Sequence, residues 1–213
     1  MKTDDLISLL ATGVAPIDQH LLARKFWIAL LTGATGACLL MAALLGFRND
    51  LAEISAKPAF WAKVALPTCL LAGSNWMLTR LARAGVRPGN SSWLIAAPVV
   101  IVWLAAAYVL VNEPANFRLP LILGKTWRVC PLLITLLSLP TLITMFGALR
   151  ALTPTRLTLV GAVCGLSAGS TATLAYCLHC PEMEIPFWAV WYILGMAVPT
   201  IVGALLGPRL LRW

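Results

Sequence analysis

The chain has 213 residues, of which 60% are hydrophobic and only 11% are charged, and its formal net charge is +8. Soluble domains carry about 45–50% apolar residues, so this composition and a mean hydropathy of +0.87 exclude a soluble enzyme domain of any size. The basic excess predicts the cytoplasmic flanks of membrane spans rather than a nucleic-acid interface, because no basic patch is interleaved with aromatic residues.

Residues 1–25 are predicted to form two short amphipathic helices. In the first, Thr3 is a candidate N-cap, and the acidic residues Asp4 and Asp5 fall in the first turn, where the helix dipole favours them. One apolar face follows, made of Leu6, Leu9 and Leu10. Pro16 is typical of the start of the second helix. Two interpretations stay open for this segment: a helix lying on lipid headgroups or a helix that docks in a partner's groove.

Six apolar stretches of about 20 residues follow, which is the length of a bilayer-spanning helix. Their expected bounds are 26–46, 60–79, 91–111, 129–149, 157–177 and 187–207. Aromatic residues mark their edges, as in an interfacial belt. The fold class is therefore all-α: a polytopic membrane protein with six transmembrane helices. It divides into a short N-terminal helical segment, 1–25, and a transmembrane domain, 26–213.

The distribution of Lys and Arg predicts the orientation. Ten of the 16 basic residues fall on the side that holds both termini, and six fall on the other side together with five acidic residues. Both termini are therefore expected in the cytoplasm. The loop between the fifth and sixth spans, which has no Lys or Arg, is expected outside.

Two further patterns concern the interior of the spans. Gly161, Gly165 and Gly169 form a small-xxx-small pattern that predicts close contact with another helix. Gly203 and Gly207 repeat the spacing on the sixth span. Lys63 is close enough to the end of the second span to extend its ammonium group toward the headgroups. No span contains Asp or Glu, which argues against a proton-coupled or cation-coupled transporter.

The stretch from Tyr176 to Glu184 concentrates two thiols, one imidazole and two carboxylates between apolar spans. With the predicted topology, Cys130, Cys177 and Cys180 lie at one depth on the outer side, where an oxidising compartment permits thiol chemistry. His179 and Arg128 are close enough in sequence to raise thiolate content. The other three cysteines, Cys38, Cys69 and Cys164, are expected to be small buried hydrophobic residues.

Several chemistries remain open for this stretch. A metal site could use Cys177 and Cys180 with His179, Glu182 and Glu184. A quinone-linked thiol-disulfide oxidoreductase would need a second outer cysteine pair, and one of the three outer thiols has no partner. An ordinary outer turn kinked at Pro181 is the third interpretation. Ser/His/Asp catalysis is excluded, because His20 and His179 are predicted on opposite sides of the membrane.

The whole chain resembles the NrsF-like six-span membrane anti-sigma factors of proteobacteria. The segments that carry the resemblance are MKTDDLISLL at 1–10, FWAK at 60–63, WRVC at 127–130, HCPE at 179–182 and LLGPRLLRW at 205–213. The resemblance implies a regulator, not an enzyme, that keeps an extracytoplasmic-function (ECF) sigma factor inactive at the bacterial inner membrane. It also implies that two periplasmic cysteines, Cys130 and Cys180, govern release under oxidative or heavy-metal stress. Cys177 is outside the family pattern.

These implications complete the expected site. Cys130, Cys180, His179, Glu182 and Cys177 would carry redox or metal sensing. Asp4, Asp5, Leu6, Leu9 and Leu10 would bind the sigma factor. No resident cofactor is expected, although a heavy-metal ion could bind transiently to Cys180, Cys130 and His179. The expected partners are the sigma factor and membrane lipid, with no direct contact to nucleic acid.

Overall fold

The computed structural model describes residues 19–81, 91–150 and 156–212, and every regular element in these ranges is a helix. The long helices are α2 (Gln19–Leu44), α4 (Pro58–Leu81), α5 (Ser91–Asn112), α7 (Cys130–Arg150), α8 (Leu157–Cys177) and α9 (Ile185–Leu210). Two short helices, α3 (Leu51–Ser55) and α6 (Ala115–Leu123), lie in the connections. The all-α prediction is confirmed for the described residues.

Five of the long helices, α2, α5, α7, α8 and α9, are long and apolar enough to cross a membrane. The remaining long helix, α4, has 24 residues but is not among the five. Its interior carries Lys63, Ser74 and Asn75, which make it less apolar than the others. The apolar helices indicate a membrane protein, and a sixth crossing by α4 stays a prediction.

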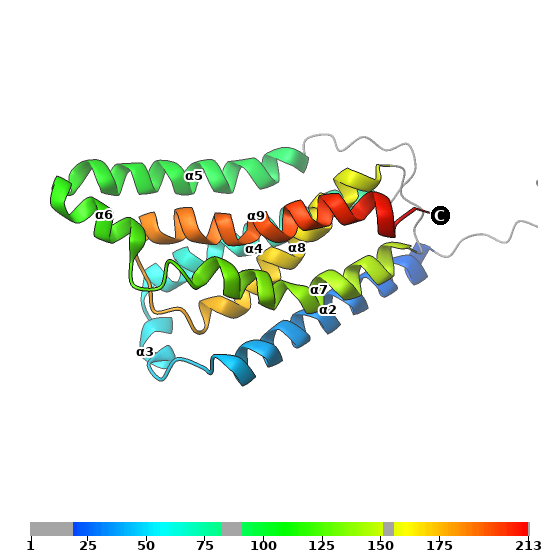
Figure 1. The fold of residues 1–213 in the computed structure, drawn as a ribbon, viewed down its shortest axis with the longest axis horizontal. Helices are drawn as coiled ribbons and strands as arrows, with labels where there is room; N and C mark the ends of the chain where they lie inside the picture. Colours follow the sequence, from blue (N-terminus) through cyan, green and yellow to red (C-terminus); the bar gives the residue numbers. More distant parts are fainter. Residues whose placement is uncertain (1–18, 82–90, 151–155, 213) are drawn as a thin grey trace, which may run out of the picture.

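The long helices alternate in direction, so both ends of the described chain lie at the same end of the bundle (Figure 1). Helix α8 lies at the centre of the bundle, and 67% of its most apolar stretch is buried. The corresponding share is 11% for α5, which lies along one edge. Large apolar side chains cover the outside, Trp93, Ile101 and Leu104 on α5 among them. Such a surface is typical of a bundle embedded in lipid rather than water.

Helix α2 begins before the first predicted span. It runs without a break from Gln19 through Arg24 and Lys25 into the apolar stretch, because no glycine or proline separates them. The predicted second short helix is therefore continuous with the first long helix from Gln19 onward. The first predicted short helix, with Asp4, Asp5, Leu6, Leu9 and Leu10, lies outside the described residues.

The predicted glycine contact is present between α8 and α9. A Cβ atom added at Gly161 would fall on the carbonyl oxygen of Gly203, and one added at Gly165 would fall on that of Pro199. From the other side, a Cβ at Gly207 would fall on the carbonyl oxygen of Leu157. The two helices thus meet backbone to backbone, which only residues without a side chain permit.

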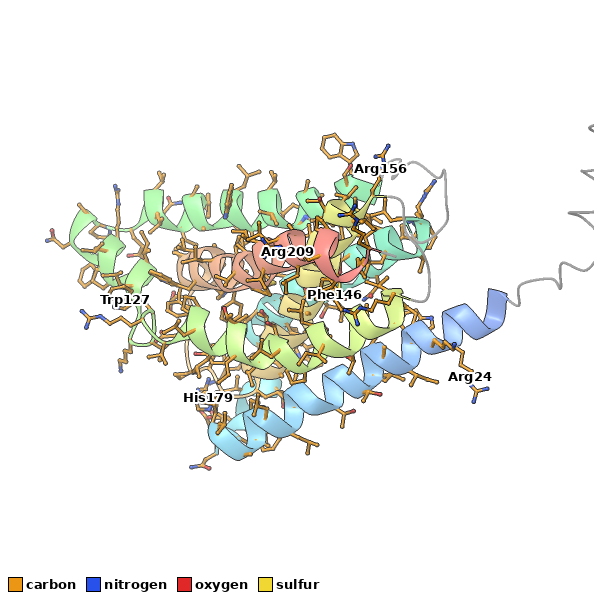
Figure 2. All side chains as sticks on the ribbon, turned by 45° about the vertical axis from the view of Figure 1, so that its right-hand side comes forward. Arg24, Trp127, Phe146, Arg156, His179 and Arg209 are labelled. Atoms are coloured by element: carbon orange, nitrogen blue, oxygen red, sulfur yellow. The ribbon has the colours of Figure 1, made fainter. Side chains whose placement is uncertain are left out.

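Three arginines and the cysteine stretch mark opposite ends of the bundle (Figure 2). Arg24, Arg156 and Arg209 lie at one end, and Trp127 and His179 lie at the other. We call the second end the cysteine end.

Since basic residues favour the cytoplasmic side, reporter fusions at Trp213 and in the connection after α8 are expected to report cytoplasmic and periplasmic locations, respectively. A periplasmic reporter signal at Trp213 would contradict this orientation.

Candidate functional site

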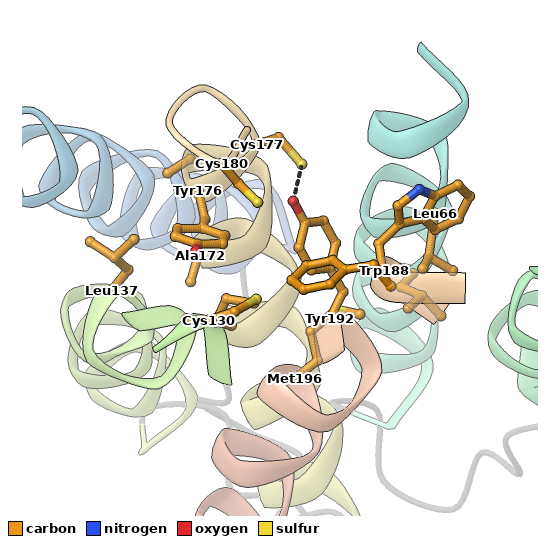
Figure 3. Close-up of a cluster of buried hydrophobic side chains, with 14 of the residues drawn as sticks. Leu66, Cys130, Leu137, Ala172, Tyr176, Cys177, Cys180, Trp188, Tyr192 and Met196 are labelled. Carbon is orange, nitrogen blue, oxygen red and sulfur yellow. Dashed lines mark hydrogen bonds between the residues drawn. The ribbon is translucent and has the colours of Figure 1, made fainter. Parts of the chain in front are cut away.

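Three cysteines come together at the cysteine end. Cys130 is the first residue of α7, Cys177 is the last residue of α8, and Cys180 follows in the turn before α9. All three belong to one buried cluster, and none is more than 1% exposed (Figure 3). Each is a free thiol in this state. The cluster therefore holds reduced cysteines from two helices and the turn that follows α8.

The stretch around Cys180, which the sequence predicts on the outer side of the membrane, is folded into the bundle. The backbone amides of His179 and Cys180 both donate to the carbonyl of Tyr176, at 3.0 and 2.9 Å. These bonds continue the last turn of α8 and bring the Cys180 side chain into the core instead of releasing it into solvent. Reagents can therefore reach the Cys180 thiol only when the turn after α8 opens locally.

Two tyrosines form the polar lining of the cluster. The Tyr176 side chain is a polar neighbour of both Cys130 and Cys180, and the Cys177 thiol donates to the Tyr192 hydroxyl at 4.0 Å. The two phenol rings lie 6.1 Å apart in an edge arrangement. Tyr176 thus lies near the two cysteines that the family resemblance singles out, while the Cys177 thiol donates to Tyr192.

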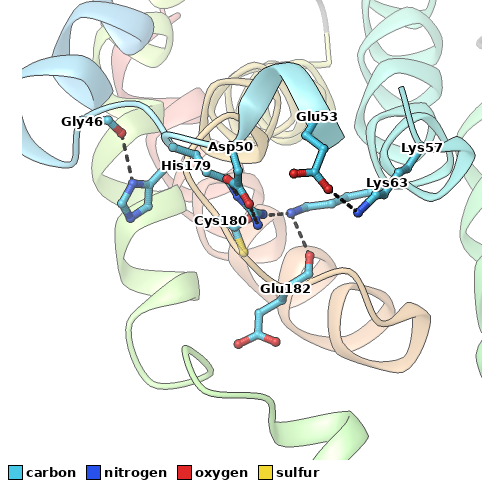
Figure 4. A network of polar contacts seen from close by, with 9 residues as sticks. Gly46, Asp50, Glu53, Lys57, Lys63, His179, Cys180 and Glu182 are labelled. Atoms are coloured by element: carbon cyan, nitrogen blue, oxygen red, sulfur yellow. Dashed lines mark hydrogen bonds and ion pairs between the residues drawn. The ribbon is translucent and has the colours of Figure 1, made fainter. Parts of the chain in front are cut away.

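Lys63 enters the cluster from α4, and the expectation that it extends toward the headgroups is wrong. The side chain is fully buried. Its Nζ donates to the carbonyl oxygens of Cys180, at 2.8 Å, and of Glu182, at 2.9 Å (Figure 4). It also lies 5.7 Å from the centre of the Tyr192 ring. The ammonium group turns inward because two carbonyls and an aromatic face replace its water shell.

Arg48 holds the same turn from the outside. Its Nη1 donates to the Cys180 carbonyl at 3.1 Å, and its other nitrogens pair with Asp50. The hydrogen bond from Arg48 lowers the pKa of Asp50, and the same bond raises the pKa of Arg48. A lowered carboxyl pKa means that the pairing contributes stability above the ordinary Asp pKa and loses it as the pH falls through the lowered value. At neutral pH both groups are charged.

The other predicted ligands point elsewhere. The His179 ring nitrogen Nδ1 lies 3.1 Å from the Gly46 carbonyl, and the Glu182 carboxylate accepts from the backbone amide of Lys125 at 2.7 Å. The Arg128 guanidinium stacks over Trp127, 5.0 Å from the ring centre. Within residues 19–81, 91–150 and 156–212, no three His, Cys, Asp or Glu side chains group to hold a metal ion. Among the described residues, the geometry therefore gives the metal alternative no preformed site with three or more ligands.

The remaining cysteines divide into two kinds. Cys164 is buried between helices as predicted. Cys38 and Cys69 are exposed on the outside of the bundle, so the prediction that they are buried is wrong. Helices α2 and α4 each direct one apolar face outward, where hydropathy cannot distinguish lipid from core.

Comparison with known proteins identifies the family of this chain. The family model NrsF, "Negative regulator of sigma F", matches residues 10–213. Two relatives align over the full length of both chains: "Probable anti-sigma-F factor NrsF" of Azospira oryzae, 44% identical, and "Anti-sigma-F factor NrsF" of Caulobacter vibrioides, 36% identical. No solved structure matches. This is a regulatory family rather than an enzymatic one, which argues against the oxidoreductase alternative. The chain belongs to the NrsF family of negative regulators of sigma F.

Proposed function

We propose that this protein keeps an ECF-type sigma factor inactive at the inner membrane and releases it when Cys130 and Cys180 change their chemical state. Two full-length relatives named as anti-sigma-F factors support a sigma factor as the partner. The observation that carries the switch is the shared burial of Cys130 and Cys180 in one cluster at the cysteine end.

The chemistry of the switch follows from two thiols on different segments. Oxidation would join the Sγ atoms of Cys130 and Cys180, and an oxidant such as a peroxide would take up the two electrons and two protons. A soft metal ion could instead bind the same two sulfurs as thiolates, with loss of two protons. Either product changes the distance between the start of α7 and the turn after α8. The free energy of that change can bias the bundle between two arrangements.

A route from the cluster toward the N-terminal segment runs through α7 and α2. Cys130 begins α7, and α7 packs closely along α2: a Cβ at Gly33 would lie 2.5 Å from the Thr141 Cα, and one at Gly36 would lie 2.9 Å from the Pro140 ring. Since α2 leads back to residues 1–18, a displacement of α7 would move the helix that presents the N-terminal segment. A coupling of about 1–3 kcal/mol between the two ends is typical of such devices.

Affinity capture from detergent-solubilised membranes tests the output. The full-length protein is expected to co-purify a sigma factor from unstressed cells and to lose it after treatment with oxidant or soft metal. Recovery of a periplasmic thiol protein with no sigma factor would overturn the proposal in favour of thiol exchange.

A double substitution of Leu6 and Leu9 by Asp tests the N-terminal grip. Apolar residues at helical spacing anchor a helix in a groove, and a buried carboxylate without a partner is costly. The variant is expected to insert in the membrane normally while a sigma-dependent reporter becomes active without stress. The control is Ser8→Asp, because Ser8 lies away from the apolar face of Leu6, Leu9 and Leu10 at helical spacing. Leu39, exposed on α2, is not a suitable control, because Asp at that position would lie in lipid. Full repression by the double variant would leave only the headgroup-helix interpretation.

A further inference from the structure

Lys63 is a buried cation that is paired with no carboxylate among the described residues. The ion pairs recorded among the described residues are Arg48 with Asp50 and Lys57 with Glu53, and neither includes Lys63. Its ammonium group is held by the carbonyls of Cys180 and Glu182 and by the face of Tyr192. The compensation for burying this charge therefore comes from the backbone of the cysteine turn and from one aromatic ring on α9.

This arrangement couples the charge to the position of Cys180. A buried ammonium group that loses its acceptors is strongly unfavourable. If the turn after α8 swings outward, both carbonyls leave Lys63 together, because they belong to residues two positions apart. The closed turn and the satisfied lysine are thus two aspects of one state. The hold crosses between elements, since Lys63 lies on α4 while its acceptors lie between α8 and α9.

Arg48 adds a second, weaker hold on the same atom. It donates to the Cys180 carbonyl at 3.1 Å from the segment before α3, and its backbone amide donates to the Leu178 carbonyl at 3.4 Å. The Cys180 carbonyl oxygen therefore receives two cationic donors, one buried and one near the surface (Figure 4).

We propose that Lys63 is the latch of the switch: a positioning residue whose ammonium group keeps the turn of Cys180 to Glu182 closed over the cysteines and so sets how readily Cys130 and Cys180 react. The inference rests on the proposed function and names the control of thiol access within it. The latch is part of the resting protein and needs no metal, cofactor or sigma factor.

Thiol labelling of the full-length protein in membranes tests the latch. Membrane vesicles are treated with a water-soluble maleimide, and labelling of each cysteine is followed by peptide mass spectrometry. In Lys63→Met, which keeps an unbranched apolar side chain one atom shorter but removes the charge and both hydrogen bonds, Cys130 and Cys180 are expected to react about tenfold faster or more, the factor that loss of even one hydrogen bond to a charged group implies. Lys57→Met removes the same charge at the surface, where Glu53 pairs with it, and is expected to label like wild type.

Two further measurements separate a latch from a loss of fold. Arg48→Gln replaces the outer cationic donor by a shorter, neutral one without touching the buried position, and it is expected to raise labelling of Cys180 by a smaller factor than Lys63→Met. Cys164, which lies farther along α8 in a separate buried cluster, is expected to stay protected in both variants. Unchanged labelling of Cys130 and Cys180 in Lys63→Met, or an equal gain at Cys164 in both variants, would overturn the latch. Because the assay contains no sigma factor, its failure is distinct from failure of the proposed function, which the reporter measures.

Discussion

Serine in place of Cys130 or of Cys180 is expected to abolish the response of a sigma-dependent reporter to oxidant and to soft metal, while repression in unstressed cells persists. Serine is nearly isosteric with cysteine, and a buried hydroxyl at either position has the Tyr176 side chain as a polar neighbour, so the fold should survive. It can neither form a disulfide nor act as a soft ligand. The 5- to 150-fold change in partner affinity that is roughly typical of allosteric coupling should therefore disappear.

The pattern across variants makes this prediction specific. The double variant should match either single variant, because both thiols serve one bond or one adduct. Cys38→Ser and Cys69→Ser, on the outer surface, and Cys164→Ser, in a separate cluster, should respond normally. Cys177→Ser, whose thiol pairs with Tyr192, should weaken the response at most mildly. A normal stress response in the Cys130/Cys180 double variant would contradict the proposed switch. Thiol labelling from the outer side that is identical before and after stress would contradict it as well.

Hydropathy predicts five of the long helices well, because each contains a long apolar run of about the length that crosses a membrane. The expected span 157–177 coincides with α8, and 91–111 differs from α5 by one residue. The glycine contact is also predictable from the sequence, since small residues four positions apart on an apolar helix are typical of close packing against another helix. Helices α3 and α6 are not predicted from the sequence, because five and nine residues are too few to give a strong periodic signal.

The arrangement at the cysteine end is only partly predictable from the sequence. The sequence indicates that Cys130, Cys177 and Cys180 share a level, but not that the turn folds inward, because that depends on acceptors and donors far apart in the chain. Lys63 lies 117 residues from Cys180. A lysine one turn into an apolar helix is compatible both with extension to the headgroups and with a buried partner, and no local pattern separates them. Arg48, Tyr176 and Tyr192 were missed for the same reason.

Alanine at Gly165 is expected to destabilise the bundle severely. The added Cβ would fall on the Pro199 carbonyl oxygen and lie 2.8 Å from the Thr200 Cα, so it meets backbone rather than a movable side chain. Helices α8 and α9 must then separate, and α8 is the centre of the bundle. Overpacking of this kind costs about 3 kcal/mol, which corresponds to a fall of roughly 6–12 °C in the unfolding temperature of a chain this size. Thermal unfolding of the detergent-solubilised protein measures it.

The same contact can be tested from both helices against a matched control. Gly203→Ala places its Cβ on the Gly161 carbonyl oxygen and is expected to be as damaging as Gly165→Ala. Gly147→Ala, within α7, meets no atom within 4 Å, and alanine is the better helix former by about 1 kcal/mol. The control should therefore unfold at the wild-type temperature or slightly above it. If Gly165→Ala and Gly203→Ala unfolded at the wild-type temperature, α8 and α9 would not be in backbone contact. A shift of α8 at the cysteine end would then not have to displace α9.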